Sequence, residues 1–449
     1  MTIKNNDHFF DNLFRIALPI ALQNLAISSV NMLDTIMVGR LGARELASVG
    51  LANQIWFLLM LFMFGSSTGA GVFIAQFWGK KDIKGIKKTA GLSMTISLCA
   101  SLLFMLASLL IPKTLISLYS KDPEVIRLGA IYLKKVAISY PITALSFSLS
   151  LTLRSVEQVR LPMAATVVSL FINALFNYIL IFGKLGFPAM GVAGAAYATV
   201  LARFVETLIV LAGAYAIKSP PAGKLRELSN WDWPFVSRFT SIAAPVILNE
   251  ILWSLGITVY NAIMARVGTN AIAAFNVTNT ISQLAMVIFM GSANAAAIMI
   301  GKRIGEGEIS SAFDWAKRFA VLSPVFGIAV GLLVVPSAFL LPYLFFLEAE
   351  PLRQAARMVF VLAAVIPVKA FNLHMIVGIC RAGGDTKFGA FFDLFGVWFV
   401  GIPLGLLGAF VFKLEPWLVF FLFYTDELSK SGLGIWRLVS KRWLNDVTK

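Results

Sequence analysis

A carboxylic acid, Asp34, lies in a strongly apolar stretch near the start of the chain. Inserting a charged side chain at the centre of a bilayer costs about 2.5 kcal/mol or more, so such residues pair with a counter-charge or bind an ion or proton. Asn24, Ser28 and Asn31 precede Asp34 at spacings of three and four residues, which places them along one helical face. We predict that this face lines a water-filled cavity, with Asp34 binding a proton or cation and the other three residues facing a substrate. The alternative is a packed interior in which Asp34 pairs with Lys or Arg.

This pattern recurs in the second half of the chain. Shifted by 226 residues, the sequence matches itself without a gap from about residue 16 to residue 79, and the identical pairs include Pro19 with Pro245, Arg40 with Arg266 and Gly42 with Gly268. A period this long marks a duplicated half-protein, since solenoid units repeat every 20 to 50 residues or so. The equivalent face carries Glu250 and Asn261. We predict Glu250 as a second ion- or proton-binding carboxylate and Asn261 as a cavity residue, with an internal ion pair of Glu250 as the alternative.

Two amides, Asn173 and Asn177, interrupt a further apolar stretch one helical turn apart. Both therefore face the same way, where they can coordinate a cation or hydrogen-bond a protonated Asp34. Simple helix–helix hydrogen bonding, worth about 0.6 kcal/mol per contact, suits the same spacing. We place both residues with Asp34 in the predicted ion or proton site.

Three polar residues, Lys369, Asn372 and His374, break another apolar run. We predict that Lys369 and Asn372 face the cavity, and Lys369 is also a candidate counter-ion for Glu250. His374 titrates near neutral pH and is a candidate proton relay, although a histidine among apolar residues is more often a packed, hydrogen-bonded one.

The remaining charged residues of the apolar stretches are expected to be structural. Arg203 and Glu206 lie three residues apart on one helical face, where they neutralise each other. Spacings of three and four residues also predict a local ion-pair cluster of Asp426, Glu427 and Lys430, and Asp393 is a further buried charge.

Catalytic and metal-binding motifs are absent from the sequence. It has no Walker motif, no HExxH and no GxSxG, and its two histidines lie in different halves. Cys99 and Cys380 lie in apolar segments too far apart to indicate a disulfide or a metal site. We predict a protein that is not an enzyme and has no cofactor or bound metal.

The elements that must position these residues are membrane-spanning helices. The chain is 58% hydrophobic and only 14% charged, with a mean hydropathy of +0.81. About 20 apolar residues cross a bilayer, and twelve such spans can be placed, six on each side of the polar segment 218–233. We predict an all-α polytopic membrane protein of two pseudo-symmetric six-helix bundles: an N-terminal lobe, 1–217, a cytoplasmic linker, 218–233, and a C-terminal lobe, 234–449. Such duplicated membrane proteins commonly alternate access to a central site.

The distribution of basic residues predicts the orientation. Roughly 24 Lys and Arg residues lie in the termini and in alternate loops, against roughly 10 in the other loops, which makes both termini cytoplasmic. We expect no cleavable signal at the N-terminus, because no small-residue cleavage site follows its polar stretch. The net charge of +15 therefore indicates orientation and contact with anionic lipids rather than nucleic-acid binding. We expect a monomer in the cell's inner (plasma) membrane.

The chain resembles the multidrug and toxic compound extrusion (MATE) family. The resemblance rests on Pro19, on Asp34-Thr35 followed by Gly39-Arg40-Leu41-Gly42, on Asn173 and Asn177, and on the segment Arg381-Ala-Gly-Gly-Asp385-Thr386-Lys387. It covers almost the whole length. It implies two six-helix bundles that export cationic or amphipathic organic compounds in exchange for inward H⁺ or Na⁺.

The resemblance also implies roles for single residues. Asp34 matches the family's cation- or proton-binding carboxylate, and Asn173 and Asn177 match its polar partners, although some members have Asp in place of Asn177. Glu250 matches an acid used by one branch. That branch has a second acid where this chain has Val368-Lys369-Ala370-Phe371-Asn372, so the resemblance favours a site around Asp34.

One alternative function, a flippase for lipid-linked saccharides or lipids, belongs to the wider superfamily. It predicts a cavity lined with Arg and Lys that binds pyrophosphate, and the candidates for that role are Lys369, Arg203, Lys134 and Lys135.

Overall fold

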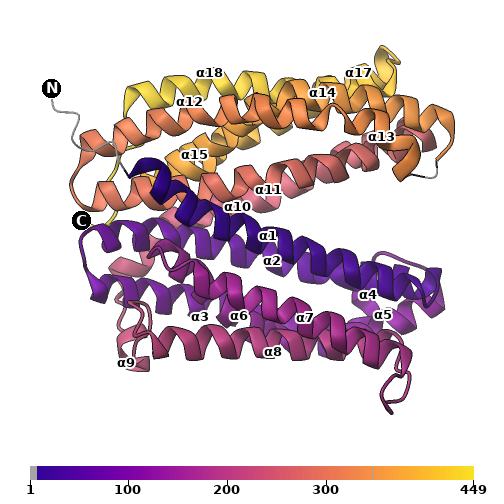
Figure 1. The fold of residues 1–449 in the computed structure, drawn as a ribbon, viewed down its shortest axis with the longest axis horizontal. Helices are drawn as coiled ribbons and strands as arrows, with labels where there is room; N and C mark the ends of the chain where they lie inside the picture. Colours follow the sequence, from indigo (N-terminus) through magenta and orange to yellow (C-terminus); the bar gives the residue numbers. More distant parts are fainter. Residues whose placement is uncertain (1–7, 346) are drawn as a thin grey trace. The chain divides into compact units, whose positions relative to one another are not determined.

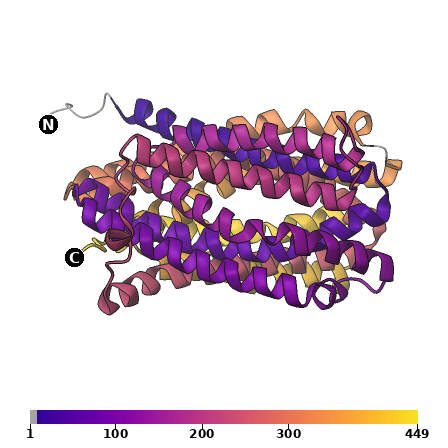
Figure 2. The same cartoon turned by 90° about the horizontal axis from the view of Figure 1, so that it is seen from below.

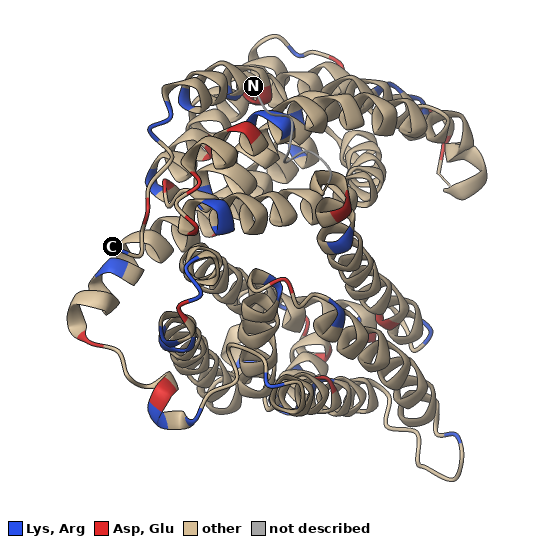
Figure 3. Ribbon diagram, turned by 60° about the vertical axis from the view of Figure 1, so that its left-hand side comes forward, with Lys and Arg blue, Asp and Glu red and all other residues tan. Residues whose placement is uncertain are grey.

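The computed structural model describes residues 8–345 and 347–449, and this part of the chain contains helices and no β-strand (Figure 1). Ten helices are long and apolar enough to cross a membrane, and α5 (Pro123–Val136) with α6 (Ser139–Ser155), bent by 53°, forms an eleventh span. The twelfth predicted span corresponds to α17 (Pro416–Phe423) and α18 (Thr425–Ser440). In Figure 3 most of the helical length is free of charged residues. The predicted all-α polytopic fold is confirmed.

Two compact units make up the described chain. The N-terminal unit is Pro19–Ile247, and the C-terminal unit is Leu248–Lys449 together with the part of α1 (Phe9–Gly39) that precedes Pro19. Both α1 and α10 (Trp233–Val267) therefore change unit in mid-helix, close to Pro19 and to Pro245. Because an internal proline removes a backbone hydrogen bond, these are equivalent weak points of two repeated helices.

The N-terminal unit is a helical bundle that surrounds the polar residues of α1. Its other helices are α2 (Ala43–Gly79), α3 (Ile83–Leu110), the short α4 (Pro112–Ser117), α5, α6, α7 (Arg160–Phe182), α8 (Val192–Ala216) and the short α9 (Leu225–Leu228). In Figures 1 and 2, α7 and α8 lie side by side along their lengths. The apolar core is built around Leu59, Met63, Leu133 and Tyr140.

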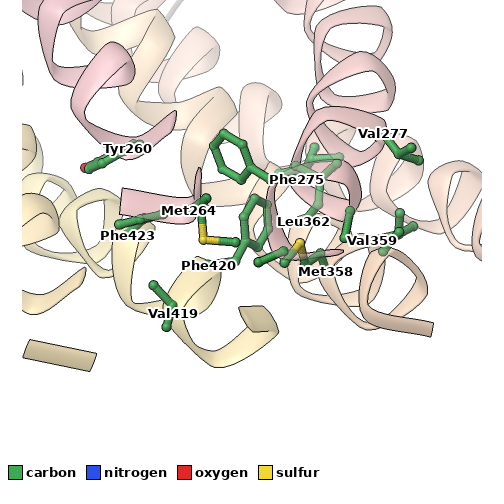
Figure 4. Packing of buried hydrophobic residues seen from close by; sticks show 14 of the residues in the cluster. Tyr260, Met264, Phe275, Val277, Met358, Val359, Leu362, Val419, Phe420 and Phe423 are labelled. Atoms are coloured by element: carbon green, nitrogen blue, oxygen red, sulfur yellow. The ribbon is translucent and has the colours of Figure 1, made fainter. Parts of the chain in front are cut away.

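The C-terminal unit repeats this plan. It contains α11 (Thr269–Gly305), α12 (Ile309–Val334), α13 (Ser337–Leu344), α14 (Ala349–Leu373) with its π-helical continuation η1 (His374–Cys380), the interrupted helix α15 (Thr386–Phe395), η2 (Gly396–Gly401), α16 (Ile402–Leu406) and η3 (Leu407–Val411), then α17 and α18. In its core Tyr260 stacks on Phe423 with ring centroids 4.2 Å apart, beside Phe275 and Phe420 (Figure 4).

The duplication extends further in structure than in sequence. Helices that begin at residues 43, 83, 123 and 160 have counterparts that begin at 269, 309, 349 and 386, each 226 residues later. Gly42 and Gly268 precede the first of these pairs, with φ angles of 147° and 155° that favour glycine. The two backbones therefore keep the same plan well beyond residue 79, where the sequence match ends.

Close packing explains the small residues of α2. A Cβ atom on Gly65 would lie 2.6 Å from the Cα atom of Ile247, and one on Gly69 would lie 2.8 Å from that of Ala243, so the first half of α10 packs directly on these glycines. The helices approach each other through small residues, as membrane helices commonly do.

The polar segment 218–233 is docked on α3. Lys87 Nζ lies 3.0 Å from Glu227 Oε1, and Lys88 Nζ lies 2.6 Å from Asp232 Oδ1. Between these ion pairs the backbone of Leu228 closes on Gly91, where a Cβ atom would lie 1.9 Å from the Leu228 carbonyl oxygen. The segment is thus held by two ion pairs and one tight backbone contact.

Candidate functional site

The N-terminal unit encloses a cavity of about 780 Å³, within the usual range of about 300–1,000 Å³ for small-molecule sites. Helices α1, α2, α5, α6, α7 and α8 all contribute to its wall. Its polar lining includes Asp34, Asn173, Arg154, Arg203 and Glu206, and much of the remainder is aromatic or aliphatic. The cavity therefore combines an apolar wall with a few charged groups.

Three of the predicted site residues meet here, Asp34 and Asn173 in the cavity lining and Asn177 bonded to both. Asn177 Nδ2 donates hydrogen bonds to Asp34 Oδ1 at 2.5 Å and to Asn173 Oδ1 at 3.0 Å. Both asparagines are buried, and Asn177 Oδ1 has no hydrogen-bond partner among the described residues. A buried acceptor without a donor is costly. The carboxylate and this amide oxygen fit a proton on Asp34 or a small hard cation, whose preferred ligands are oxygens.

A second contact fixes the register of the two helices that carry these residues. Gln23 Nε2 donates to Thr166 Oγ1 at 2.9 Å, and Gln23 precedes Asp34 by as many residues as Thr166 precedes Asn177. Those 11 residues are about three helical turns, so both contacts lie on the same faces of α1 and α7, which run parallel. The bond between Asp34 and Asn177 is one of two such contacts between α1 and α7.

The contact between Gln23 and Thr166 continues into a series of contacts with charged residues. Thr166 Oγ1 donates to Glu206 Oε1 at 2.9 Å, and Arg203 Nη1 lies 2.6 Å from Glu206 Oε2. Arg154 Nε donates to Gln23 Oε1 at 3.1 Å. The ion pair of Arg203 with Glu206 is confirmed, whereas Gln23, Thr166 and Arg154 were not among the predicted site residues. The one available signal was Arg154 itself, a charge in an otherwise uncharged helix.

The cavity-facing side of α1 differs from the predicted stripe. Its lining residues are Gln23, Ile27, Val30, Asn31, Asp34, Thr35 and Val38, so Asn31 contributes to the wall. Asn24 and Ser28 are not part of this lining, and Ser28 is exposed. Adjacent helical positions differ by about 100°, so a stripe displaced by one residue faces another direction.

The predicted acid of the C-terminal unit lies in an ion pair. Glu250 Oε1 is 2.7 Å from Arg381 Nη2, and both side chains are largely buried. Lys369, the candidate counter-ion, instead lies 3.4 Å from Ser282 Oγ and over the ring of Tyr424. Arg381, from the motif after η1, is thus the counter-charge of Glu250.

Asn372 and the predicted charge cluster lie together in the interior of the C-terminal unit. Lys430 Nζ is 2.9 Å from Asp426, 3.0 Å from Asp393 and 3.9 Å from Glu427. Asn372 Nδ2 donates to Glu427 Oε2 at 2.7 Å. This confirms the predicted ion-pair cluster. Asn372 is buried against it.

The other two polar residues of this unit make local contacts. His374 Nδ1 lies 2.8 Å from the carbonyl oxygen of Ala370, which can only accept, so this nitrogen carries a proton. The opposite ring nitrogen lies 2.9 Å from Ser292 Oγ. Asn261 donates to the Ile257 carbonyl of its own helix. Both ring nitrogens of His374 are therefore occupied, as in a packed histidine.

Comparisons with known proteins agree over most of the chain. The MatE family model matches residues 19–179 and 245–407. A probable multidrug resistance protein NorM of Thermotoga maritima is 26% identical over 96% of this chain and 92% of its own, and a probable multidrug resistance protein YoeA of Bacillus subtilis is 24% identical over 88% and 86%.

Solved structures show the same fold. A mutant of the MATE transporter VcmN of Vibrio cholerae superposes with a TM-score of 0.87 at 19% identity, covering 97% of this chain and 98% of that one. A transporter of the MOP superfamily from Pyrococcus furiosus, whose binding pocket is described as having reverse polarity, gives 0.83 at 19% identity, with 96% and 95% covered. The family model matches both halves of the chain, and the multidrug-resistance relatives and the shared fold agree with it. The protein is a multi-pass membrane transporter of small molecules and not an enzyme. This chain belongs to the MatE family of multidrug efflux transporters.

Proposed function

We propose that the protein is a secondary antiporter that exports cationic or amphipathic organic compounds in exchange for H⁺ or Na⁺ by alternating access. The observation that supports this most directly is Asp34 in the wall of the 780 Å³ cavity, bonded to Asn177 beside an unpaired amide oxygen. One site can then bind either an ion at the carboxylate or an organic molecule along the apolar wall. We propose that the two lobes of the antiporter are 1–217 and 234–449, joined by the linker 218–233.

The position of Asp34 on α1 suggests how an ion reaches it. With both termini cytoplasmic and the protein in the inner membrane, α1 runs outwards, and Asp34 lies five residues before its last residue, Gly39. An ion or proton from outside therefore meets Asp34 near the outer end of the helix. Neutralising the carboxylate removes its attraction for a cationic substrate and weakens its bond from Asn177.

Coupling requires that ion and substrate favour different conformations, because a ligand with equal affinity for both shifts nothing. The contacts between α1 and α7 offer such a difference. Neutral Asp34 loses its charge-assisted bond to Asn177, while the bond between Gln23 and Thr166 is unaffected. We assign coupling to Asp34 rather than to Glu250, since Arg381 already neutralises Glu250.

The charge of the cavity favours antiport over the flippase alternative. Two acids, Asp34 and Glu206, balance two bases, Arg154 and Arg203, whereas a pyrophosphate site needs an excess of bases. Lys369, another candidate for that role, lies in the C-terminal unit beside Ser282.

The test is efflux of a fluorescent organic cation from proteoliposomes, driven separately by a Na⁺ gradient and by a pH gradient. We expect wild type to respond to one gradient. Asp34→Asn should lower gradient-driven efflux by about tenfold or more while dye still binds. Asp314→Asn, an exposed acid on α12, is the matched control. Normal gradient-driven efflux by Asp34→Asn contradicts the proposal, and transport of lipid-linked saccharide without either gradient would support the flippase.

A further inference from the structure

Arg154, on α6, is a buried cation that forms no ion pair with any described residue. Its residue is only 9% exposed and lines the cavity. The hydrogen bond from Nε to Gln23 Oε1 is the only one it makes among the described residues, and no carboxylate of these residues lies within 4.0 Å of its guanidinium nitrogens. The other four N–H donors of an arginine are thus left without a described acceptor.

Such a charge is costly in a low-dielectric interior. A partly desolvated cation is stabilised when an anion pairs with it, and guanidinium groups bind carboxylates and phosphates through paired N–H donors. The nearest acid in the same chain of contacts, Glu206, is already engaged by Arg203 and Thr166. The guanidinium of Arg154 therefore has N–H donors that can bind an anion and that no described residue occupies.

Asp34, the cavity acid that is not part of the ion pair of Arg203 with Glu206, is far from this group. Gln23, which holds Arg154, lies 11 residues before Asp34 on α1, a separation of about 16 Å at 1.5 Å per residue. The wall also carries aromatic and sulfur-containing residues: Trp56, Phe57, Met60, Tyr132, Tyr140 and Phe147. The cavity thus carries, besides the ion pair of Arg203 with Glu206, a guanidinium at Arg154, a carboxyl group at Asp34 about three helical turns away, and an apolar wall.

We propose that Arg154 is a substrate-recognition residue, and that the cavity of the N-terminal unit selects zwitterionic aromatic compounds whose anionic group, a carboxylate, sulfonate or phosphate, binds the Arg154 guanidinium. This inference rests on the proposed function, because it takes the cavity as the site of the exported compound. It adds a specific requirement: a cation without an anionic group leaves Arg154 unsatisfied and binds more weakly.

A matched pair of dyes tests this directly. The probes are a rhodamine with a free carboxylate and the methyl ester of the same rhodamine, which differ in the anionic group and share the cationic ring system. Fluorescence polarisation measures the Kd of each for the full-length protein in detergent. We expect wild type to bind the free acid about tenfold more tightly than the ester, from hydrogen bonds to a charged group.

The variants separate recognition from folding. Arg154→Gln should bring the ratio of the two Kd values to about one, chiefly by weakening binding of the free acid, and Arg154→Lys should retain part of the preference because it keeps the charge. Arg353→Gln, an exposed arginine on α14, is the control and should behave as wild type. Equal Kd values in wild type, or an unchanged ratio in a folded Arg154→Gln protein, would overturn the inference.

The binding assay in detergent and the efflux assay in proteoliposomes together distinguish failure of the inference from failure of the proposed function. If neither gradient drives efflux of the ester but Arg154→Gln abolishes the preference for the free acid, the antiport proposal fails and the inference stands. If a gradient drives efflux but wild type binds both dyes equally, antiport stands and the recognition role of Arg154 fails. Thermal unfolding of each variant establishes that the measured protein is folded.

Discussion

The two repeated units treat buried charge in opposite ways. In the N-terminal unit Arg154 has no carboxylate within 4.0 Å among the described residues and faces a cavity. In the C-terminal unit a single ammonium, Lys430, lies within 4.0 Å of three carboxylates. Among the described residues, Arg154 of one unit therefore has no ion-pair partner, whereas Lys430 of the other is neutralised internally.

Equivalent positions show how the duplication diverged. A shift of 226 residues places Asp34 on Tyr260 and Thr166 on Phe392. Tyr260 packs face to face on Phe423, so the position that carries the proposed coupling acid in one unit belongs to the apolar core in the other. A duplicated backbone can thus keep its helix boundaries while only one copy retains a site.

Removing Lys430 tests this difference with the largest expected effect. Lys430→Met leaves three buried carboxylates without their cation, and breaking a buried ion pair in this way typically costs about 3–5 kcal/mol. We expect a large fall in thermal stability in detergent. Arg154→Met, which strands no carboxylate, should fall much less. Similar losses for the two variants would show that the contrast between the units is wrong.

Asp34, the proposed coupling acid, provides the next largest effect, on transport rather than stability. We expect Asp34→Asn to reduce gradient-driven efflux about 5- to 150-fold, which is the usual range of coupling between two binding sites. Its unfolding temperature should change little. Glu250→Gln should instead lower the unfolding temperature, because it leaves Arg381 buried without its partner. Loss of coupling in a stable Glu250→Gln protein would place an ion site in the C-terminal unit as well.

Asn177 should have a smaller effect of the same kind. Asn177→Leu removes the donor to Asp34 and the unpaired acceptor together, so folding should change little, whereas ion binding loses an oxygen ligand. We expect the ion concentration for half-maximal efflux to rise by about tenfold, which corresponds to 1.4 kcal/mol. Asn261→Leu, whose amide bonds only within its own helix, is the control. An unchanged ion dependence would remove Asn177 from the site.

Local sequence could predict the parts of the site that depend on spacing within one helix. The ion pair of Arg203 with Glu206 and that of Lys430 with Asp426 follow from positions three and four residues apart. Arg154 with Gln23 and Glu250 with Arg381 are 131 residues apart, and only the packing of distant helices brings them together.

The direction of a helix face was likewise beyond local reasoning. Asn24, Ser28 and Asn31 form a stripe in sequence, yet only Asn31 lines the cavity, because the neighbouring helices select a face shifted by one residue. The docked linker was predicted only as a polar segment, since its fit depends on the absence of a Cβ atom at Gly91 on another helix.

The smallest expected effect concerns the linker, which also distinguishes the units. Positions equivalent to Lys87 and Gly91 on α12 are Phe313 and Lys317, so the ion pairs and the tight contact that hold the linker exist on α3 alone. Gly91→Val should therefore displace the linker, seen as faster hydrogen exchange of residues 224–228. α12, the equivalent helix, lacks the residues that form these contacts on α3.

The linker should also respond to acid. Hydrogen bonds from the Lys224 backbone and from Lys87 lower the pKa of Glu227, and Lys88 lowers that of Asp232. Because docking lowers the pKa values of these two carboxyl groups, their ionised forms stabilise the docked linker at any pH above the ordinary carboxyl pKa of about 4. This stabilisation is lost as the pH falls through the lowered pKa values. Hydrogen exchange of residues 224–228, corrected for its intrinsic pH dependence, should therefore show protection that weakens only in acid. Glu227→Gln replaces the titrating carboxyl group with a neutral amide and should remove most of that pH dependence. Glu306→Gln, in the other unit, should leave it intact. Protection that is independent of pH would mean that the backbone contact at Gly91 alone holds the linker.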